Sequence, residues 1–206
     1  MKVTIIGAGN MGRGIGTRVV AGGNDVEVID HDPAEARKLA DELGERASAA
    51  DTPGGEVVVL ALPYGAVADV IDEHREALAG KVVVDITNPA DWSTMDRVVT
   101  PEGSSAAEEI AKLLGGDARV VKAFNTTFAG TLAAGQVAGQ PLDVLIAGDD
   151  EDAKRTVSSL VEAGGMRPLD LGPLTRARQL EQVGLLHIAS QDALGTGFGS
   201  AVKLIW

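Results

Sequence analysis

Short apolar runs rich in valine and isoleucine recur along this chain and alternate with segments of helical periodicity. The runs are apolar at nearly every position, which is typical of strands that are buried on both faces. Strands of this kind alternating with helices predict a parallel sheet covered on both sides. We therefore expect an α/β fold, a Rossmann-like doubly wound and mostly parallel sheet of about seven or eight strands. The predicted strands are residues 2–7, 25–30, 56–62, 81–86, 119–124, 142–147 and 167–170.

The composition excludes several classes of protein. The chain has 206 residues, of which 45% are hydrophobic and 23% charged, as in ordinary globular domains. It has no cysteine, which excludes thiolate catalysis and iron–sulfur clusters. The 30 acidic residues against 18 basic ones give a net charge of −12, so we expect no nucleic acid partner. Because no apolar run reaches about 18 residues and no signal-peptide pattern is present, we expect no membrane association and a cytoplasmic location.

A glycine motif follows the first predicted strand directly and opens the first predicted helix. Residues 7–12 read Gly-Ala-Gly-Asn-Met-Gly, which is the spacing G-x-G-x-x-G. The first glycine permits a tight turn, the second lets the main chain approach a pyrophosphate, and the third lets the helix close on the strand. The helix N-terminus adds free N–H donors and a partial positive charge. The motif predicts a dinucleotide site at Gly7, Gly9, Asn10, Met11 and Gly12.

An acidic residue ends the second predicted strand, about 20 residues after the glycine motif, where such folds bind the adenosine ribose. This residue is Asp30, and His31 follows it. A carboxylate accepts hydrogen bonds from the ribose hydroxyls and repels a 2′-phosphate, so Asp30 favours NAD over NADP. His31 and Arg37 could instead supply positive charge, which leaves NADP open. Asp32 is better placed than Asp30 to cap the helix that begins at Pro33.

Three later stretches add to the glycine motif. They are Val-Val-Asp-Ile-Thr-Asn-Pro at 83–89, Val-Val-Lys-Ala-Phe-Asn-Thr at 120–126 and Arg-Pro-Leu-Asp-Leu-Gly at 167–172. Together the four segments resemble the family of reductases that pass hydride between NADP and the deazaflavin coenzyme F420. They are also similar to the cytosolic domain of the six-transmembrane metalloreductases, which binds NADPH and feeds a flavin. The resemblance covers residues 1–206 and implies an oxidoreductase that exchanges hydride between NAD(P)H and a small-molecule acceptor, either F420 or a flavin.

The resemblance also implies where the ligands lie. The glycine motif would contact the pyrophosphate, and residues 62–64 would flank the nicotinamide ribose. The ends of the next two strands would position the nicotinamide and the acceptor, without an acid–base catalyst. These placements agree with the rule that ligands lie beyond the carboxyl ends of the strands. The residues concerned are Leu62, Pro63 and Tyr64 at the ribose, and Asn88, Pro89, Asn125 and Thr126 at the reacting rings.

The C-terminal segment has a different pattern, helical from about residue 174 and then broken by glycines. We expect residues 1–172 to form the dinucleotide-binding domain and residues 173–206 to complete the same domain. The tail would cover the acceptor pocket or pack on a second subunit, and a homodimer is the expected assembly. No metal site is expected, because the acidic run at 149–152 matches the start of a helix.

Two other functions remain open from the residues alone. One is an NAD(P)-dependent reductase of a small carbonyl or imine, which needs a proton donor beside the developing oxyanion. The other is a non-catalytic nucleotide-binding or sensing protein. Candidate donors are few, since we expect His74 to be solvent-exposed and His187 to be a satisfied core residue. Lys122 could donate a proton, but the resemblance implies that it supports the cleft. This scarcity favours hydride exchange between rings.

Overall fold

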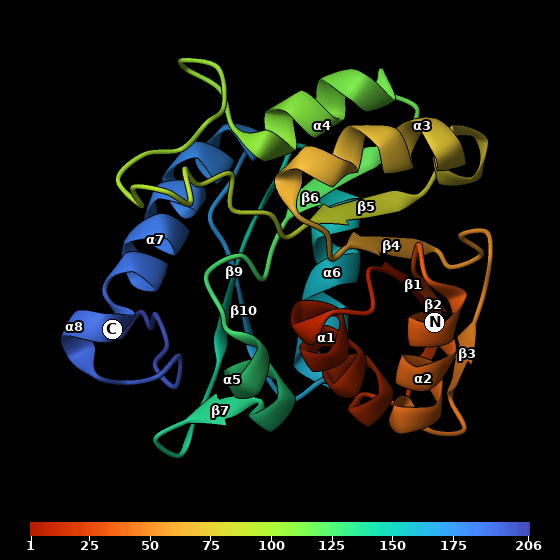
Figure 1. Cartoon of the computed structure of the whole chain (residues 1–206), viewed down its shortest axis with the longest axis horizontal. Helices are drawn as coiled ribbons and strands as arrows, with labels where there is room; N and C mark the ends of the chain where they lie inside the picture. The colour runs from red at the N-terminus through yellow and green to blue at the C-terminus, as the bar shows by residue number, and fades with distance from the viewer.

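The computed structural model describes residues 1–206 and contains one eight-stranded sheet with helices on both faces (Figure 1). The sheet has the strand order β10-β9-β6-β5-β4-β1-β2-β3. This confirms the Rossmann-like fold. The strands are β1 (Lys2–Ile6), β2 (Asp25–Ile29), β3 (Ala47–Ala49), β4 (Val57–Leu60), β5 (Val82–Asp85), β6 (Arg119–Lys122), β9 (Asp143–Gly148) and β10 (Arg167–Asp170).

Two layers of helices bury the aliphatic residues of the sheet. The helices α1, α2 and α6 pack on one face, and α3, α4 and the start of α7 pack on the other. Figure 1 shows α3 and α4 together above the sheet, with α1 and α2 below it. The helices are α1 (Asn10–Ala21), α2 (Pro33–Leu43), α3 (Val67–Leu78), α4 (Ala106–Leu114), α5 (Ala129–Ala134), α6 (Glu151–Ala163), α7 (Ala177–Ala189) and α8 (Gln191–Leu194), with short 3-10 turns η1 (Tyr64–Ala66) and η2 (Leu174–Arg176).

The last two strands run against the rest of the sheet. Strand β9 pairs antiparallel with β6, and β10 then pairs parallel with β9. Between β6 and β9 the chain forms α5 and a small hairpin of β7 (Gln136–Val137) and β8 (Gln140–Pro141). A parallel connection has to carry the chain back across the sheet to the end at which the previous strand began, usually through a helix. Here β9 instead starts from the end of the sheet at which β6 finishes, so no such crossover is needed. Neither this reversal nor β3 and the hairpin was predicted from the sequence.

The strand order predicts a ligand crevice beyond the carboxyl ends of the central strands β1 and β4. Strand β1 pairs in parallel with β2 on one side and with β4 on the other. The chain thus winds outward from β1 in both directions, and ligands of such sheets bind beyond the carboxyl ends of the strands at this switch point. The glycine motif follows β1, and Leu62, Pro63 and Tyr64 follow β4. None of the helices is long and apolar enough to cross a bilayer.

A buried ion cluster ties α7 to the sheet. The Nζ atom of Lys122 lies 2.8 Å from Asp85 Oδ2, 2.9 Å from Glu181 Oε1 and 2.6 Å from the Thr87 carbonyl oxygen. All three charged side chains are at most 1% exposed. Burial raises the pKa of Glu181, and the ammonium group of Lys122 opposes that rise. Lys122 is itself buried and therefore supports the cleft by fixing the residues at the ends of β5 and β6. Because Glu181 joins α7 to this cluster, we propose that residues 173–206 complete one domain with residues 1–172.

Removing the cation of this cluster should destabilise the protein strongly. In Lys122→Met two buried carboxyl groups lose their partner, and loss of one member of a buried ion pair costs about 3–5 kcal/mol. Urea denaturation followed by circular dichroism measures the change. Arg155→Ala serves as control, because its ion pair with Asp152 is 70% and 74% exposed and such pairs contribute about 0–1 kcal/mol. An equal loss of unfolding free energy in the two variants would contradict a structural role for the cluster.

Candidate cofactor and acceptor site

The three glycines of the motif have different surroundings. Gly7 has a φ angle of +113°, and a Cβ atom there would lie 2.2 Å from the Ala61 carbonyl oxygen. A Cβ atom on Gly12 would lie 2.0 Å from the Gly7 carbonyl oxygen, so the helix could not close on the turn. A Cβ atom on Gly9 would meet no atom within 4 Å. The fold therefore requires Gly7 and Gly12, whereas Gly9 keeps an open surface over which a ligand can approach the main chain.

The main-chain N–H groups at the N-terminus of α1 have no side chain as a hydrogen-bond acceptor. No side chain caps α1 and no acidic residue lies in its first turn. By contrast, Asp32, Ser105 and Asp150 cap α2, α4 and α6. The first-turn N–H groups of a helix need a partner, and a phosphate group suits them. The residues present thus fit a diphosphate at Gly9–Gly12. Asp32 is confirmed as a helix cap, and Asp150 in the acidic run acts as one too.

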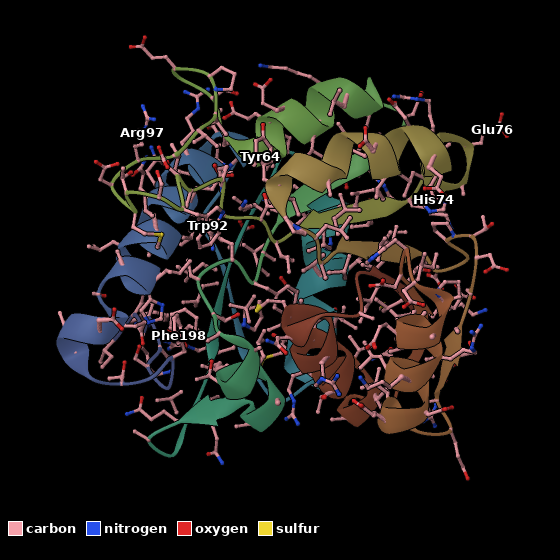
Figure 2. The ribbon with its side chains drawn as sticks, in the orientation of Figure 1. Tyr64, His74, Glu76, Trp92, Arg97 and Phe198 are labelled. Atoms are coloured by element: carbon pink, nitrogen blue, oxygen red, sulfur yellow. The ribbon has the colours of Figure 1, made fainter.

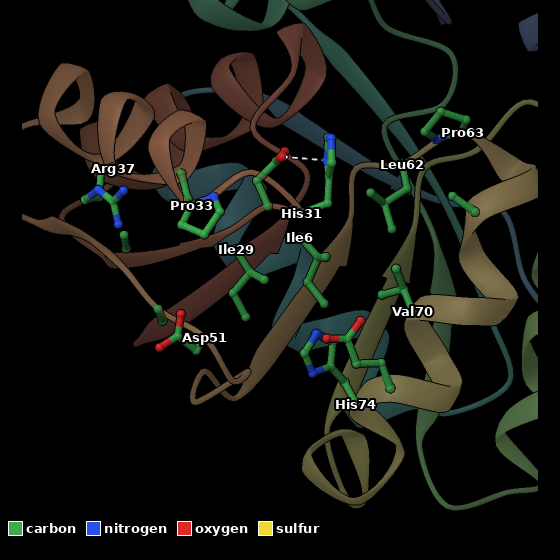
Figure 3. Close-up of a pocket in the computed structure, with 16 residues that line it drawn as sticks. Ile6, Ile29, His31, Pro33, Arg37, Asp51, Leu62, Pro63, Val70 and His74 are labelled. Atoms are coloured by element: carbon green, nitrogen blue, oxygen red, sulfur yellow. Dashed lines mark ion pairs between the residues drawn. The ribbon is translucent and has the colours of Figure 1, made fainter.

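A cavity of about 870 Å³ lies beside the turn and is called here the acidic cavity, since Asp30, Asp51 and Glu73 line it (Figure 3). Main-chain N–H groups hold the Asp30 carboxylate: Ala8 donates to Oδ2 at 2.7 Å and Asp32 to Oδ1 at 3.0 Å. The full lining is Ile6, Ile29, Asp30, His31, Pro33, Ala36, Arg37, Ala49, Ala50, Asp51, Leu62, Pro63, Ala66, Val70, Glu73 and His74.

The expectation that His74 is solvent-exposed is wrong. The residue is 9% exposed and lines the acidic cavity. Its charged neighbours in the segment Asp-Glu-His-Arg-Glu suggested a solvated face. On α3, however, His74 lies three residues after the buried Ile71 and four before the buried Leu78, which places it on the apolar stripe. Helical spacing from Ile71 would have placed His74 correctly.

A second cavity, of about 540 Å³, adjoins the first, because Leu62 and Pro63 line both. We call it the aromatic cavity, since Tyr64, Trp92, Phe128 and Phe198 line it. Figure 2 labels Tyr64, Trp92 and Phe198, which lie on separate segments of the chain. No charged side chain belongs to its lining, which is Gly9, Asn10, Met11, Ala61, Leu62, Pro63, Tyr64, Ile86, Thr87, Asn88, Trp92, Asn125, Thr127, Phe128, Ile188 and Phe198.

The predicted site residues divide between the cavities and the scaffold behind them. Gly9, Asn10, Met11, Leu62, Pro63, Tyr64, Asn88 and Asn125 line the aromatic cavity, and Asp30 and His31 line the acidic one. Gly7, Gly12, Pro89 and Thr126 are buried and line neither. Their functional roles stay predictions. Thr87, Trp92, Phe128 and Phe198 were not among the predicted site residues. Thr87 lies inside the 83–89 segment and Phe198 in the tail expected to cover the acceptor pocket, whereas the scarcity of aromatic residues was the signal for Trp92 and Phe128.

Two asparagines form a locked pair on the wall of the aromatic cavity. Asn88 Nδ2 donates to the Asn125 carbonyl oxygen at 2.8 Å, and Asn125 Nδ2 donates to Asn88 Oδ1 and to the Leu180 carbonyl oxygen, both at 2.9 Å. Asn125 Oδ1 and Thr87 Oγ1 are buried without a hydrogen-bond partner. Buried polar atoms normally have one. These two atoms therefore fit a ligand with amide groups, such as the carboxamide of nicotinamide.

A glycine inside α7 makes room for this pair. A Cβ atom on Gly184 would lie 2.4 Å from Asn88 Oδ1 and 2.9 Å from Asn125 Nδ2. Glycine in a helix interior costs about 1 kcal/mol relative to alanine, so its presence indicates close packing. The sequence does carry this signal, as a glycine in the middle of the predicted C-terminal helix. Gly184 lets α7 contact the two asparagines in the loops that follow β5 and β6.

The C-terminal tail closes one side of the aromatic cavity. The Phe198 ring meets the Phe128 ring edge-on, with centroids 5.0 Å apart, and the Phe128 ring lies 4.3 Å from that of His187. His187 Nδ1 lies 3.2 Å from the Thr126 carbonyl oxygen, and Nε2 lies 2.8 Å from Ser200 Oγ. Burial lowers the pKa of His187. His187 is thus a satisfied core residue, as expected, and the tail lines the cavity through Phe198.

Known proteins share both the sequence and this architecture. Residues 2–89 match the protein family described as NADP oxidoreductase coenzyme F420-dependent. The F420-dependent NADP reductase of Methanocaldococcus jannaschii is 31% identical over 221 residues, covering 96% of each chain. This chain belongs to the F420-dependent NADP reductase family. The family assignment confirms the resemblance found in the sequence and identifies the chain as an oxidoreductase of an NADP-linked family.

Two further relatives bear on the extent of the similarity to this reductase family. Metalloreductase STEAP3 of Rattus norvegicus is 35% identical over 195 residues, which are 92% of this chain but 37% of that protein. The chain therefore spans little more than a third of STEAP3. A solved structure from Arthrobacter sp. FB24 superposes with a TM-score of 0.87 over 100% of both chains, at 28% identity. The whole chain, with its C-terminal segment, thus has a counterpart of known structure.

Substitutions at two glycines should separate ligand binding from folding. Gly9→Ala adds a methyl group where no protein atom lies within 4 Å, so we expect a native melting temperature and at least tenfold weaker binding of NADH and NADPH. Gly12→Ala places the same group against the main chain and should instead lower the melting temperature by several degrees. Thermal denaturation and isothermal titration calorimetry measure both effects. Native nucleotide affinity in Gly9→Ala would contradict a diphosphate site at this turn.

Proposed function

We propose that this protein transfers a hydride between a nicotinamide dinucleotide and a planar acceptor ring, either F420 or a flavin, bound in the aromatic cavity. The observation that carries the proposal is the lining of that cavity. Four of the six aromatic residues of the chain gather there, together with no charged side chain. The relatives named F420-dependent NADP reductase support F420 as the acceptor.

The geometry suits hydride exchange between two stacked rings. Aromatic side chains bind flat rings by offset stacking or edge contacts. The bound nicotinamide supplies the hydride, so the protein has to align two rings and exclude water. Asn10 and Met11 line the cavity from the diphosphate side, and Trp92 and Phe198 line it from the solvent side. The cavity can therefore receive the nicotinamide from the glycine turn and the acceptor from solvent.

Reduction of a small carbonyl or imine is the second candidate. That reaction needs a proton donor at the reacting atom. Tyr64 carries the one ionisable side chain in the lining of the aromatic cavity. Burial raises the pKa of the Tyr64 hydroxyl, and the negative charges of Glu109, Glu181 and Asp85 raise it further. A hydroxyl with a raised pKa is a weaker acid, which favours ring-to-ring hydride exchange over carbonyl chemistry.

Anaerobic mixing of the purified chain with NADH or NADPH and either F420 or FMN tests the proposal. We expect the visible absorbance of one acceptor to bleach with turnover. Tight binding of a nicotinamide nucleotide without bleaching of either acceptor would instead indicate a nucleotide-binding or sensing protein. Turnover with carbonyl or imine substrates alone would favour the second candidate. Either result would overturn hydride exchange with a flavin-type ring.

Removing an aromatic ring from the cavity should weaken acceptor binding selectively. Trp92→Ala should raise the KM for the acceptor about threefold to tenfold, because an aromatic pair contributes about 0.5–1.5 kcal/mol. The dissociation constant for the nucleotide should stay within twofold of the native value. Trp206→Ala is the matched control, because Trp206 lies outside the cavity and packs on Arg167, and both variants are assayed in the same assembly state, measured by sedimentation. Equal effects of the two variants on KM would contradict acceptor stacking in the aromatic cavity.

The expected homodimer is also proposed, on the basis of apolar side chains that the fold leaves uncovered at the C-terminal end. Leu186 is 70% exposed, Ile205 82% and Trp206 87%. Pairing of two subunits through this region would remove these side chains from water. Sedimentation equilibrium measures the assembly, and a monomer at micromolar concentration would contradict it. The cytoplasmic location stays a prediction that cell fractionation can test.

A further inference from the structure

Building on the proposed function, we infer that this chain selects NAD(H) and rejects NADP(H), in contrast to the cofactor in the names of its relatives. NAD and NADP differ only at the 2′ position of the adenosine ribose. That ribose lies beyond the end of the second strand in sheets of this type. Here the second strand leads directly to Asp30, which is joined to the glycine turn through the Ala8 N–H group. The residues around Asp30 therefore decide which cofactor fits.

The Asp30 carboxylate cannot turn away from the ribose without losing its partners in the fold. Its two oxygens accept from different main-chain N–H groups, Ala8 at 2.7 Å and Asp32 at 3.0 Å. The Ala8 N–H group is partly buried and the Asp30 side chain is 12% exposed, so this donor would not readily find water in place of the carboxylate. A rotated carboxylate would leave the Ala8 donor unpaired at the start of the diphosphate turn and would expose the Asp32 donor to solvent. The negative charge of Asp30 is thus held where the 2′ position of the ribose would bind.

The same carboxylate still has room for the hydroxyl groups of an unmodified ribose. An ionised carboxylate offers about four acceptor positions, and the two main-chain donors use two of them. His31 Nδ1 approaches Oδ1 at 2.8 Å, but its side chain is 96% exposed and can move into solvent. Two acceptor positions then remain for the 2′ and 3′ hydroxyls of NAD. A 2′-phosphate offers no such donors at neutral pH and adds negative charge beside a carboxylate.

The other charged groups of the acidic cavity reinforce this selection. Asp51 and Glu73 line the cavity in addition to Asp30, so three carboxylates face the single guanidinium of Arg37. The remaining titratable groups of the lining are the imidazoles of His31 and His74. Figure 3 shows Arg37 on the opposite side of Pro33 from His31. A phosphate dianion is usually bound by positively charged side chains. The acidic cavity as a whole is therefore unfavourable for the 2′-phosphate of NADP.

Calorimetric titration of the full chain with NADH and with NADPH tests this inference without any acceptor. We expect NADH to bind at least tenfold more tightly. Equal or tighter binding of NADPH would overturn the selectivity and leave the proposed hydride transfer intact. Failure of both nucleotides to bind would overturn the proposed function and this inference together. Bleaching of F420 or FMN, measured separately, reports on the acceptor alone.

Variants then assign the selectivity to particular carboxylates. In Asp30→Asn the side-chain NH₂ group must face one of the two main-chain N–H donors. We therefore expect the affinity for NADH to fall about tenfold and the preference for NADH over NADPH to narrow. Glu73→Gln takes no hydrogen bond from the fold and should tighten NADPH about twofold to fivefold while leaving NADH unchanged. Glu76→Gln, on the same helix but outside the acidic cavity, is the control and should change neither affinity. If Asp30→Asn does not fold, an unchanged NADPH affinity in Glu73→Gln overturns the charge argument.

Discussion

One buried ammonium group joins the elements that form the wall of the aromatic cavity. Lys122 ends β6, Asp85 ends β5, and Glu181 lies on α7, so their ion pairs join two strands to the C-terminal helix. The Lys122 ammonium also binds the Thr87 carbonyl oxygen, one residue before Asn88. Three charges removed from water would be very unfavourable singly, and they become tolerable because each is paired. The wall of the aromatic cavity therefore depends on an interaction that never touches a ligand.

The two halves of the site use different physical means for different ligand chemistry. The glycine turn and the uncapped start of α1 present main-chain N–H groups, which suit a diphosphate. On one side the Asp30 carboxylate lines the acidic cavity and offers acceptors that would suit ribose hydroxyls, and on the other the aromatic cavity presents ring faces and edges. A strongly acidic chain can hold a dinucleotide in this way, because the groups nearest the diphosphate belong to the backbone. The net charge of −12 therefore says little about the site itself.

The elements that could be predicted from the sequence are those whose cause is local. Continuous apolar runs predicted seven strands of the sheet, and the glycine spacing predicted the turn with its three distinct surroundings. The errors came where neighbours in space override neighbours in sequence. His74 stands among charged residues but lies on the buried stripe of α3, and β9 reverses direction because α5 and a hairpin return the chain from the edge at which β6 ends. Neither outcome can be judged from a window of a few residues.

Local chemistry thus determined the doubly wound sheet, the diphosphate turn and the acid beside it, because strand burial, glycine geometry and a strand-ending carboxylate act over short stretches of chain. Only the packed structure decided which side chains line the aromatic cavity. Tyr64, Trp92, Phe128 and Phe198 are distant in sequence and gather in one cavity because the strands end at a common edge and the tail folds back over it. It likewise decided the orientation of the Asp30 carboxylate, since the two N–H groups that donate to it come from different turns of the chain.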